Sequence, residues 1–289
     1  MKYDVAIVGA GLAGLVAACE LIDAKKKVLL VDQEPENSIG GGQAYWSFGG
    51  IFLVNSPEQR RLGIKDSKEL AWQDWQGTAG FDRLDDEDSW AYKWARAYVD
   101  FAAGEKYDWL KSKGIKFFPP VVGWAERGGS LAGGHGNSVP RFHIVWGGTG
   151  PGIVKPFVDK VKQAIKDGFI DFKPRHRVDE FIQQEGGEIT GISGTVLAET
   201  FINRGEKSSR LGIGEFSYEA KAVIVASGGI GGANFDLVRK NWPARLGTPP
   251  KNMVCGVPAY VDGRMLEITE HAGGDALLIV IVCGITQRG

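Results

Sequence analysis

The hydrophobic and polar positions at the start of the chain follow a strand, helix, strand pattern. Residues 5–8 form a short apolar, β-branched run without a period of its own, which suits a strand buried on both faces of a parallel sheet. Residues 12–24 are predicted to form a helix, and three lysines close its far end, where the helix dipole favours positive charge. A second apolar strand follows at residues 28–31. This part of the chain is therefore expected to form a βαβ unit.

The turn between the first strand and the helix has the spacing G-x-G-x-x-G. Gly9 allows the tight turn, Gly11 lets a pyrophosphate approach the backbone, and Gly14 lets the helix pack closely against the strand. Asp32 follows the second strand, where it can accept hydrogen bonds from a ribose hydroxyl. The pattern predicts a dinucleotide site. The alternative is a structural βαβ unit with an incidental acid at its end.

The middle of the chain is predicted to be helical at first and then to contain both helix and strands. Residues 66–112 are helical and rich in tryptophan, and these rings either form core or line a pocket for a flat substrate. Asp66 and Glu69 have the spacing of a capping box at the start of this stretch. A helix over residues 152–166, a strand over 169–172 and an antiparallel hairpin within 175–196 are expected to follow.

Residues 128–142 are glycine-rich and predicted to form a loop that carries His135 and Arg141, with His143 just after it. An arginine and histidines beside a redox centre would suit a carboxylate or carbonyl substrate. Arg141 and His143 are therefore candidate substrate residues. A solvated loop explains them equally well.

A second glycine turn follows another buried run at residues 223–225. Ala226, Ser227 and Gly228 are small, and small residues at the carboxyl end of a strand leave space for a ligand at the switch point of a sheet. The two glycine turns are expected to face one crevice.

Composition narrows the possible functions. The chain has 289 residues and a net charge of -1, which gives no reason to expect nucleic acid or an acidic membrane as a partner. Its three cysteines are far apart, which favours a reducing, cytoplasmic compartment and argues against a zinc site, and no metal is predicted. The late apolar run at residues 276–285 is shorter than the ~20 residues that a membrane span needs.

After Asp32 the chain resembles a known group of flavoproteins, the fumarate reductase, succinate dehydrogenase and 3-ketosteroid dehydrogenase family. The resemblance rests on a G-G-x-x-x-x-S-x-G-G-like segment ending at Gly50 and on the A-S-G-G turn at residues 226–229. It implies FAD as cofactor, with the first segment along the pyrophosphate and the isoalloxazine. The chain has no histidine between Asp32 and Gly50, so we expect the FAD to be bound non-covalently.

The resemblance and the glycine motifs together predict an α/β, Rossmann-like fold of the glutathione-reductase type, with a parallel sheet, a small antiparallel excursion and a helical insertion. Residues 1–60 and 143–274 would form the FAD-binding domain and residues 61–142 the insertion. The cofactor-binding candidates are Gly9, Gly11, Leu12, Ala13, Gly14, Asp32, Gln33, Gly41, Gly42, Gln43, Ser47, Gly49, Gly50, Val178, Ala226, Ser227 and Gly228. Among these, the resemblance assigns Val178 a backbone contact to adenine.

The function implied is that of an FAD-dependent oxidoreductase. It would exchange hydride between flavin and a carbon–carbon bond next to a carbonyl or carboxylate of a small-molecule substrate. The sequence identifies neither the catalytic acid or base nor the electron partner. The alternatives are an NAD(P)-dependent dehydrogenase and a truncated, inactive FAD-binding fragment.

The end of the chain departs from the family. Residues 275–289 have no helix cap and no alternation of polar and apolar positions. A back-translation of this segment, read two bases later, gives a peptide that looks like the family's continuation. The hypothesis is that residues 275–289 are a frameshifted tail on a truncated flavoprotein.

Overall fold

Strand β2 (Val28–Val31) is buried at all of its positions, as expected for an apolar run inside a parallel sheet. The computed structural model describes residues 3–86, 88–122, 136–232, 234–242, 244 and 247–274. β1 (Tyr3–Val8) pairs with β2 in parallel, and helix α1 (Leu12–Asp23) connects them. The predicted βαβ unit is confirmed.

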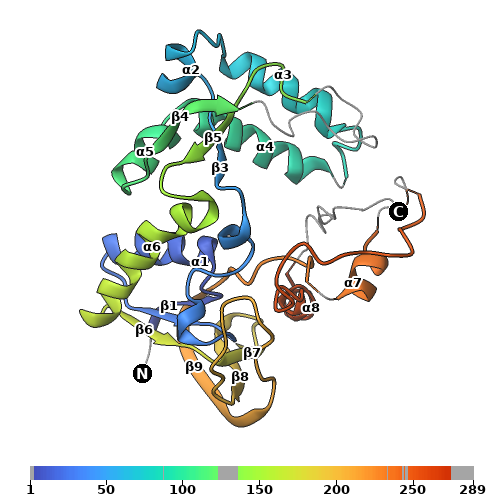
Figure 1. Cartoon of the computed structure of the whole chain (residues 1–289). Helices are drawn as coiled ribbons and strands as arrows, with labels where there is room; N and C mark the ends of the chain where they lie inside the picture. The colour runs from blue at the N-terminus through green and yellow to red at the C-terminus, as the bar shows by residue number, and fades with distance from the viewer. Residues whose placement is uncertain are drawn as a thin grey trace. The chain divides into compact units, whose positions relative to one another are not determined.

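In the part of the chain that the structure describes, the main sheet has six strands in the order β6-β2-β1-β9-β8-β7 (Figure 1). β6 (Ile170–Lys173), β2, β1 and β9 (Gly212–Val225) are parallel neighbours. β7 (His176–Gln183) and β8 (Ile189–Leu197) continue the sheet in antiparallel pairing, with the first half of β9 beside β8. This is the predicted parallel sheet with a small antiparallel excursion.

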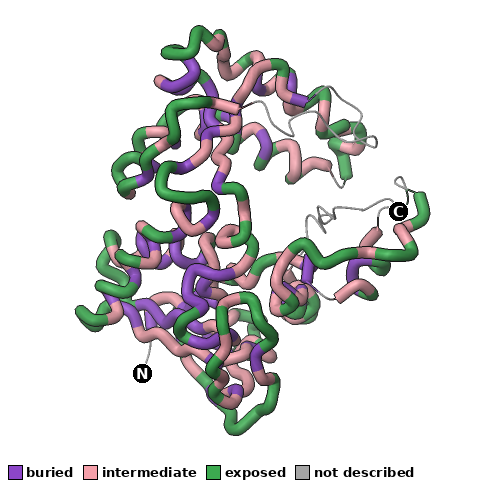
Figure 2. Tube along the Cα trace, in the orientation of Figure 1, coloured by how far each residue is buried: buried purple, intermediate pink, exposed green. Residues whose placement is uncertain are grey.

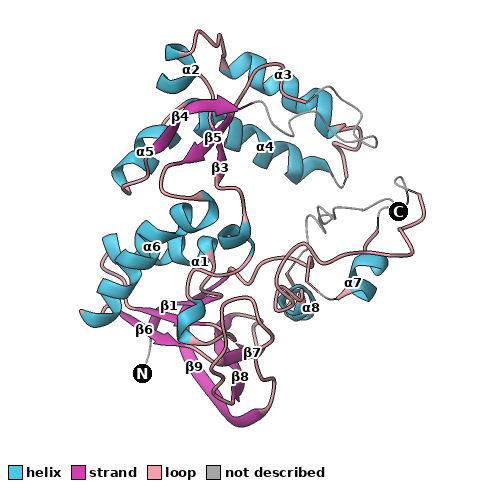
Figure 3. Cartoon of the chain, viewed as in Figure 1, coloured by secondary structure: helices cyan, strands magenta, loops and turns pink. Residues whose placement is uncertain are grey.

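The chain divides into two compact units, residues 1–46 with 157–289, and residues 47–156. The first unit holds the main sheet, α1, most of α6 (Thr149–Lys166), α7 (Phe235–Lys240) and α8 (Arg264–His271), and the short 3₁₀ turns η1 (Glu36–Ser38) and η2 (Gln43–Trp46). α6 ends at Lys166, as predicted, and Gly168 follows it with a left-handed φ of 78°, which is typical of a helix C-terminus. Figure 3 shows these elements by type.

Among its described residues, the second unit contains an antiparallel sheet in the order β3-β5-β4, helices α2 to α5 and the first part of α6. The strands are β3 (Gly50–Phe52), β4 (Phe117–Val122) and β5 (Phe142–Val145). The helices are α2 (Pro57–Arg61), α3 (Lys68–Ala79), α4 (Asp88–Ala103) and α5 (Lys106–Ser112).

The core of the first unit lies along the sheet (Figure 2). One buried cluster joins β1 and β2 to the antiparallel strands, and it includes Tyr3, Leu29, Val178 and Ile192. In the second unit, Val54, Ala71 and Val99 form a smaller cluster with Trp72 and Trp75 packed against it. The predicted tryptophan stripe is thus only partly core, since Trp90 and Trp94 of α4 are 50% and 67% exposed.

The predicted capping box at Asp66 and Glu69 is wrong. Helix α3 is capped by Ser67, whose hydroxyl accepts a hydrogen bond from the backbone N–H of Leu70. Asp66 instead faces a buried arginine, Arg141. A carboxylate three residues before a glutamate fits the local pattern of a cap, but an ion pair with a distant residue has no local signature.

Two sequence predictions fall partly or wholly outside the described residues. The proposed tail at residues 275–289 lies outside them, as does the His135 part of the predicted loop. Within the part of the chain that is described, no helix is both long and apolar enough to cross a bilayer.

A buried lysine in α5 should make stability depend on alkaline pH. Burial lowers the pKa of Lys106 to about 8 from an ordinary 10.5, and its ammonium donates to the carbonyl of Phe52 and the hydroxyl of Tyr98, both uncharged. Between these pH values the unfolded chain holds the proton and the folded chain has released it, so stability rises with pH. The gain is at most about 3 kcal/mol.

The measurement is urea unfolding at pH 8 and above for the wild type, Lys106→Met and Lys111→Met, since Lys111 is an exposed lysine in the same helix. The alkaline gain should vanish in Lys106→Met and remain in Lys111→Met. Equal pH profiles in all three proteins would contradict a pKa shift at Lys106.

Candidate functional site

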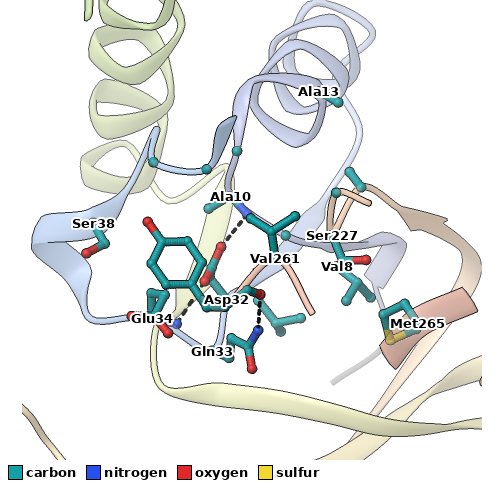
Figure 4. Close-up of a pocket in the computed structure, with 18 of the residues that line it drawn as sticks. Val8, Ala10, Ala13, Asp32, Gln33, Glu34, Ser38, Ser227, Val261 and Met265 are labelled. Atoms are coloured by element: carbon teal, nitrogen blue, oxygen red, sulfur yellow. Dashed lines mark hydrogen bonds between the residues drawn. The ribbon is translucent and has the colours of Figure 1, made fainter. Parts of the chain in front are cut away.

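Both glycine turns border one cavity at the carboxyl edge of the parallel strands. β1 and β9 are adjacent and end in register at Val8 and Val225, so the residues after them leave the sheet together. The backbone N–H of Ala226 donates to the carbonyl of Val8, and that of Gly9 donates to the carbonyl of Val31, each at 2.8 Å. The turns after β1, β2 and β9 therefore meet around the cavity (Figure 4).

Most residues proposed from the sequence as cofactor contacts line this cavity. They are Gly9, Gly11, Leu12, Ala13, Asp32, Gln33, Gly41, Gly42, Gln43, Val178, Ala226, Ser227 and Gly228. Gly14, Ser47, Gly49 and Gly50 are not among its lining residues. The fold thus brings together five separate stretches of sequence, chosen partly from glycine motifs and partly from the family resemblance. The contact of each residue with the cofactor stays a prediction.

The three glycines of the first turn have distinct environments. Gly9 has a φ of 109°, and a Cβ there would lie 2.5 Å from the carbonyl oxygen of Ala226. A Cβ on Gly14 would lie 1.9 Å from the carbonyl oxygen of Gly9, so only glycine lets the helix approach the turn this closely. At Gly11 the nearest atom would be the carbonyl oxygen of Gly41 at 3.8 Å, which leaves room for a ligand beside the backbone.

The N-terminus of α1 faces this space. The first backbone N–H bonded within the helix region is that of Leu15, which donates to the carbonyl of Gly11 at 3.0 Å. Leu12 and Ala13 precede it and line the cavity, and the first turn contains no acidic residue. The N–H groups of a first helical turn have no acceptor within the helix. Free N–H groups and the positive end of the helix dipole favour an anion such as a pyrophosphate here.

Asp32 holds the glycine turn in shape. Its Oδ2 accepts a hydrogen bond from the backbone N–H of Ala10 at 2.6 Å, and its Oδ1 accepts one from the backbone N–H of Glu34 at 2.8 Å (Figure 4). Burial raises the pKa of the Asp32 carboxyl, which these two hydrogen bonds oppose. Each oxygen keeps a second lone pair, so the ribose contact predicted for Asp32 remains compatible with both bonds.

The cavity also contains residues that sequence reasoning missed. They are Val8, Ala10, Val31, Glu34, Ser38, Ala44, His176, Arg177, Tyr260, Val261, Asp262, Arg264 and Met265. The segment 260–265 reaches the cavity because Gly263 turns with a φ of 75° into α8, and the carbonyl of Tyr260 accepts a hydrogen bond from the side chain of Gln33 at 3.0 Å. The V-D-G-R-M pattern before a helix was the available signal.

Ser47, Gly49 and Gly50 belong to the second unit. The Ser47 hydroxyl accepts a hydrogen bond from the backbone N–H of Gly49 at 3.2 Å. A Cβ on Gly49 would lie 2.4 Å from the backbone of Thr149, and one on Gly50 would lie 1.8 Å from the ring of Phe142. Packing inside this unit therefore already requires both glycines, and their approach to a flavin ring stays a prediction.

Arg141 is fully buried in a network of ion pairs. Its guanidinium binds Asp66 through two hydrogen bonds of 2.9 and 2.7 Å and donates to Asp74 at 2.6 Å and to the side chain of Asn137 at 2.7 Å. Burial alone would raise the pKa of Asp74, but hydrogen bonds from Ser138 and Arg141 outweigh it and hold that pKa below its usual value. In this structure Arg141 stabilises the second unit, and the substrate role predicted for it would require this network to open.

His143 is likewise fully buried, with both ring nitrogens engaged. Nδ1 lies 2.8 Å from the carbonyl oxygen of Arg141, which can only accept, so Nδ1 carries the proton. Nε2 then accepts from the hydroxyl of Ser56 at 2.7 Å. Burial keeps the pKa of His143 below its ordinary value, and the ring is neutral. Its substrate role also stays a prediction, and in this structure the ring supports the Ser56 cap of α2.

The features of the site define a dinucleotide-binding flavoprotein fold. Two glycine turns lie at the carboxyl edge of parallel strands, a helix N-terminus faces the cavity, and an acid follows β2. The chain belongs to the family described as FAD binding domain, whose model matches residues 4–280. Its cofactor is FAD, and the residues present fit this group: Gly11 leaves a backbone cradle open, and the buried Oε2 of Glu34 in the wall has no hydrogen-bond partner in the part of the chain that the structure describes. The predicted family and fold class are confirmed.

Similar proteins point to the same family. A KsdD-like steroid dehydrogenase of Mycolicibacterium smegmatis is 59% identical over 274 residues, which are 95% of this chain and 48% of that protein. Among solved structures, 3-ketosteroid-Δ4-(5α)-dehydrogenase from Rhodococcus jostii RHA1, in complex with 4-androstene-3,17-dione, matches with a TM-score of 0.68 at 20% identity, covering 95% of this chain and 54% of that one. A flavocytochrome c3 fumarate reductase matches with a TM-score of 0.64 at 22% identity, covering 94% and 40%. The chain spans about half the length of the curated relatives it matches.

Proposed function

We propose that the whole protein is an FAD-dependent oxidoreductase acting on a carbon–carbon bond next to a carbonyl or carboxylate, with ketosteroids as the first substrate class to test. The observation that carries the proposal is the single cavity bordered by the turns at Gly11 and Gly228. The 59% identity to a KsdD-like steroid dehydrogenase favours a steroid over a dicarboxylate.

Different residues of the cavity would bind different parts of FAD. Gly11 and the N-terminus of α1 would bind the pyrophosphate, Asp32 the ribose, and Gly41 and Gly42 the chain between them. Bound FAD supplies hydride transfer at its ring. We assign no residue to the proton transfer at the neighbouring carbon.

Two finer features belong to the same proposal. Attachment of FAD would be non-covalent, because the glycine-rich segment after Asp32 contains no histidine. The compartment would be the cytoplasm, which the three widely spaced cysteines favour over an oxidising one.

The test is an absorbance spectrum of the purified chain, followed by anaerobic addition of a 3-ketosteroid. We expect a yellow protein that releases all of its FAD on denaturation and whose flavin absorbance is bleached by the steroid. Bleaching by steroid but not by succinate would support the substrate class. A protein that remains yellow after denaturation and washing would contradict non-covalent binding.

The alternatives give different outcomes in the same experiment. A colourless protein whose tryptophan fluorescence is quenched by a nicotinamide nucleotide and not by FAD would favour an NAD(P)-dependent dehydrogenase. A yellow protein without turnover would favour an inactive FAD-binding fragment. The first outcome contradicts the proposal, and the second contradicts activity of this chain on its own, so that the steroid test is then made on a full-length protein.

A further inference from the structure

A second carboxylate borders the cavity two residues after Asp32. The side chain of Glu34 is only 3% exposed and lines the cavity near the end of β2 (Figure 4). Its Oε1 accepts a hydrogen bond from the hydroxyl of Ser208 at 3.0 Å and forms an ion pair with a guanidinium nitrogen of Arg210 at 2.8 Å. Its Oε2 is buried and has no hydrogen-bond partner among the described residues. A buried acceptor without a partner is costly, so this oxygen is suited to a ligand that can donate.

The loop between β8 and β9 holds Glu34 in place. Besides Ser208 and Arg210, the loop provides Arg204, which donates to the carbonyls of Asn37 and Ser38 at 2.7 and 2.8 Å. These contacts join the loop to the segment that follows β2, over sequence separations of 166 and 167 residues. Because Oε1 is engaged by the loop, the position of Oε2 is determined before a ligand binds.

A hydroxyl group whose proton is not donated to any described residue lies in the same cavity wall. The phenol oxygen of Tyr260 is buried beside the backbone N–H of Gly42, which can only donate to it, and it would stand 3.3 Å from a Cβ placed on Gly41. Burial raises the pKa of this phenol, so it remains a protonated donor at neutral pH. The wall thus offers one acceptor and one donor that do not bond to each other.

We propose that Glu34 and Tyr260 form a second polar contact for the adenosine half of FAD, in which Glu34 accepts a hydrogen bond from a sugar hydroxyl or the adenine amino group and Tyr260 donates one. The adenosine half is the chemically matching part because Glu34 is bonded through its backbone to Asp32, the acid placed for the ribose. The proposal rests on FAD binding in this cavity, as proposed above. It adds a specificity-determining pair that the glycine motifs do not include.

The test separates the two halves of the cofactor. Glu34→Gln keeps an oxygen for Ser208 and Arg210 and places an amide donor where Oε2 stands, so it reverses the hydrogen-bond polarity with little change in shape. Dissociation constants are measured for the apoprotein with FAD, with ADP-ribose as an adenosine probe and with FMN as a flavin probe. We expect Glu34→Gln to weaken FAD and ADP-ribose by about tenfold or more and to leave FMN unchanged.

Two further variants make the result decisive. Glu36→Gln changes an exposed glutamate of the same segment and should bind all three probes like the wild type. Tyr260→Phe removes one oxygen and should weaken ADP-ribose several-fold, which keeps the test available if Glu34→Gln folds poorly. If Glu34→Gln and Tyr260→Phe both fold and both bind ADP-ribose with wild-type affinity, the proposed Glu34–Tyr260 contact is overturned, while the proposed function is unaffected. A wild-type protein that binds neither FAD nor ADP-ribose would overturn it together with the proposed function.

Discussion

Replacing Gly14 by alanine is expected to lower the free energy of unfolding by about 3 kcal/mol and to weaken FAD binding, although alanine is the better helix former. The new Cβ would lie 1.9 Å from the carbonyl oxygen of Gly9, and this neighbour is backbone that cannot turn away. Either α1 or the turn must move. Movement of the turn displaces Ala10, whose N–H is bonded to Asp32 at 2.6 Å, so the loss extends to the cofactor site.

The matched control is Gly77→Ala, in the last turns of α3. A Cβ there meets no atom within 4 Å, so the same substitution should be neutral or stabilise the protein by up to about 1 kcal/mol. Urea unfolding monitored by circular dichroism and titration with FAD give both quantities. If Gly14→Ala were as stable as Gly77→Ala, the close packing of α1 on the first glycine turn would be refuted.

Replacing Arg141 by methionine is expected to destabilise the second unit by about 3 to 5 kcal/mol at neutral pH. The substitution keeps most of the side-chain volume and leaves the carboxylates of Asp66 and Asp74 buried without their cation. Arg96→Met is the control, because Arg96 and Asp100 form an exposed pair whose loss should cost about 1 kcal/mol or less.

Acid should reduce the difference between Arg141→Met and the wild type. The pKa of Asp74 in the folded wild type is below its ordinary value of 3.8, so its stabilising effect is present above pH 3.8 and is lost as the pH falls through the folded value. In the variant, protonation instead neutralises an uncompensated buried charge. Unfolding measurements down to acid pH should therefore show the two curves converging. A constant difference would mean that packing rather than charge determines the cost.

Prediction from sequence was accurate where the signal is local. The βαβ unit, the end of α6 before Gly168 and the hairpin of β7 and β8 follow from periodicity and from the conformational freedom of glycine over a few residues. Prediction from sequence failed at Asp66, whose ion-pair partner Arg141 is 75 residues away. It also did not select Glu34 or Tyr260. Short polar residues near a helix start fit a cap by default, and nothing nearby reveals a competing ion pair.

The sequence by itself determined the two glycine turns, because a turn that needs a missing Cβ or a positive φ requires glycine at that position. The fold family and FAD as cofactor followed from the family resemblance that these motifs carry. Only the tertiary structure decided which side chains share a wall or a core. It buried Arg141 and His143 inside their own networks, and it brought Ser208 to Glu34 across 174 residues. The physical reason is that hydrogen bonds and ion pairs between distant segments depend on strand order and loop path, which no short stretch of residues records.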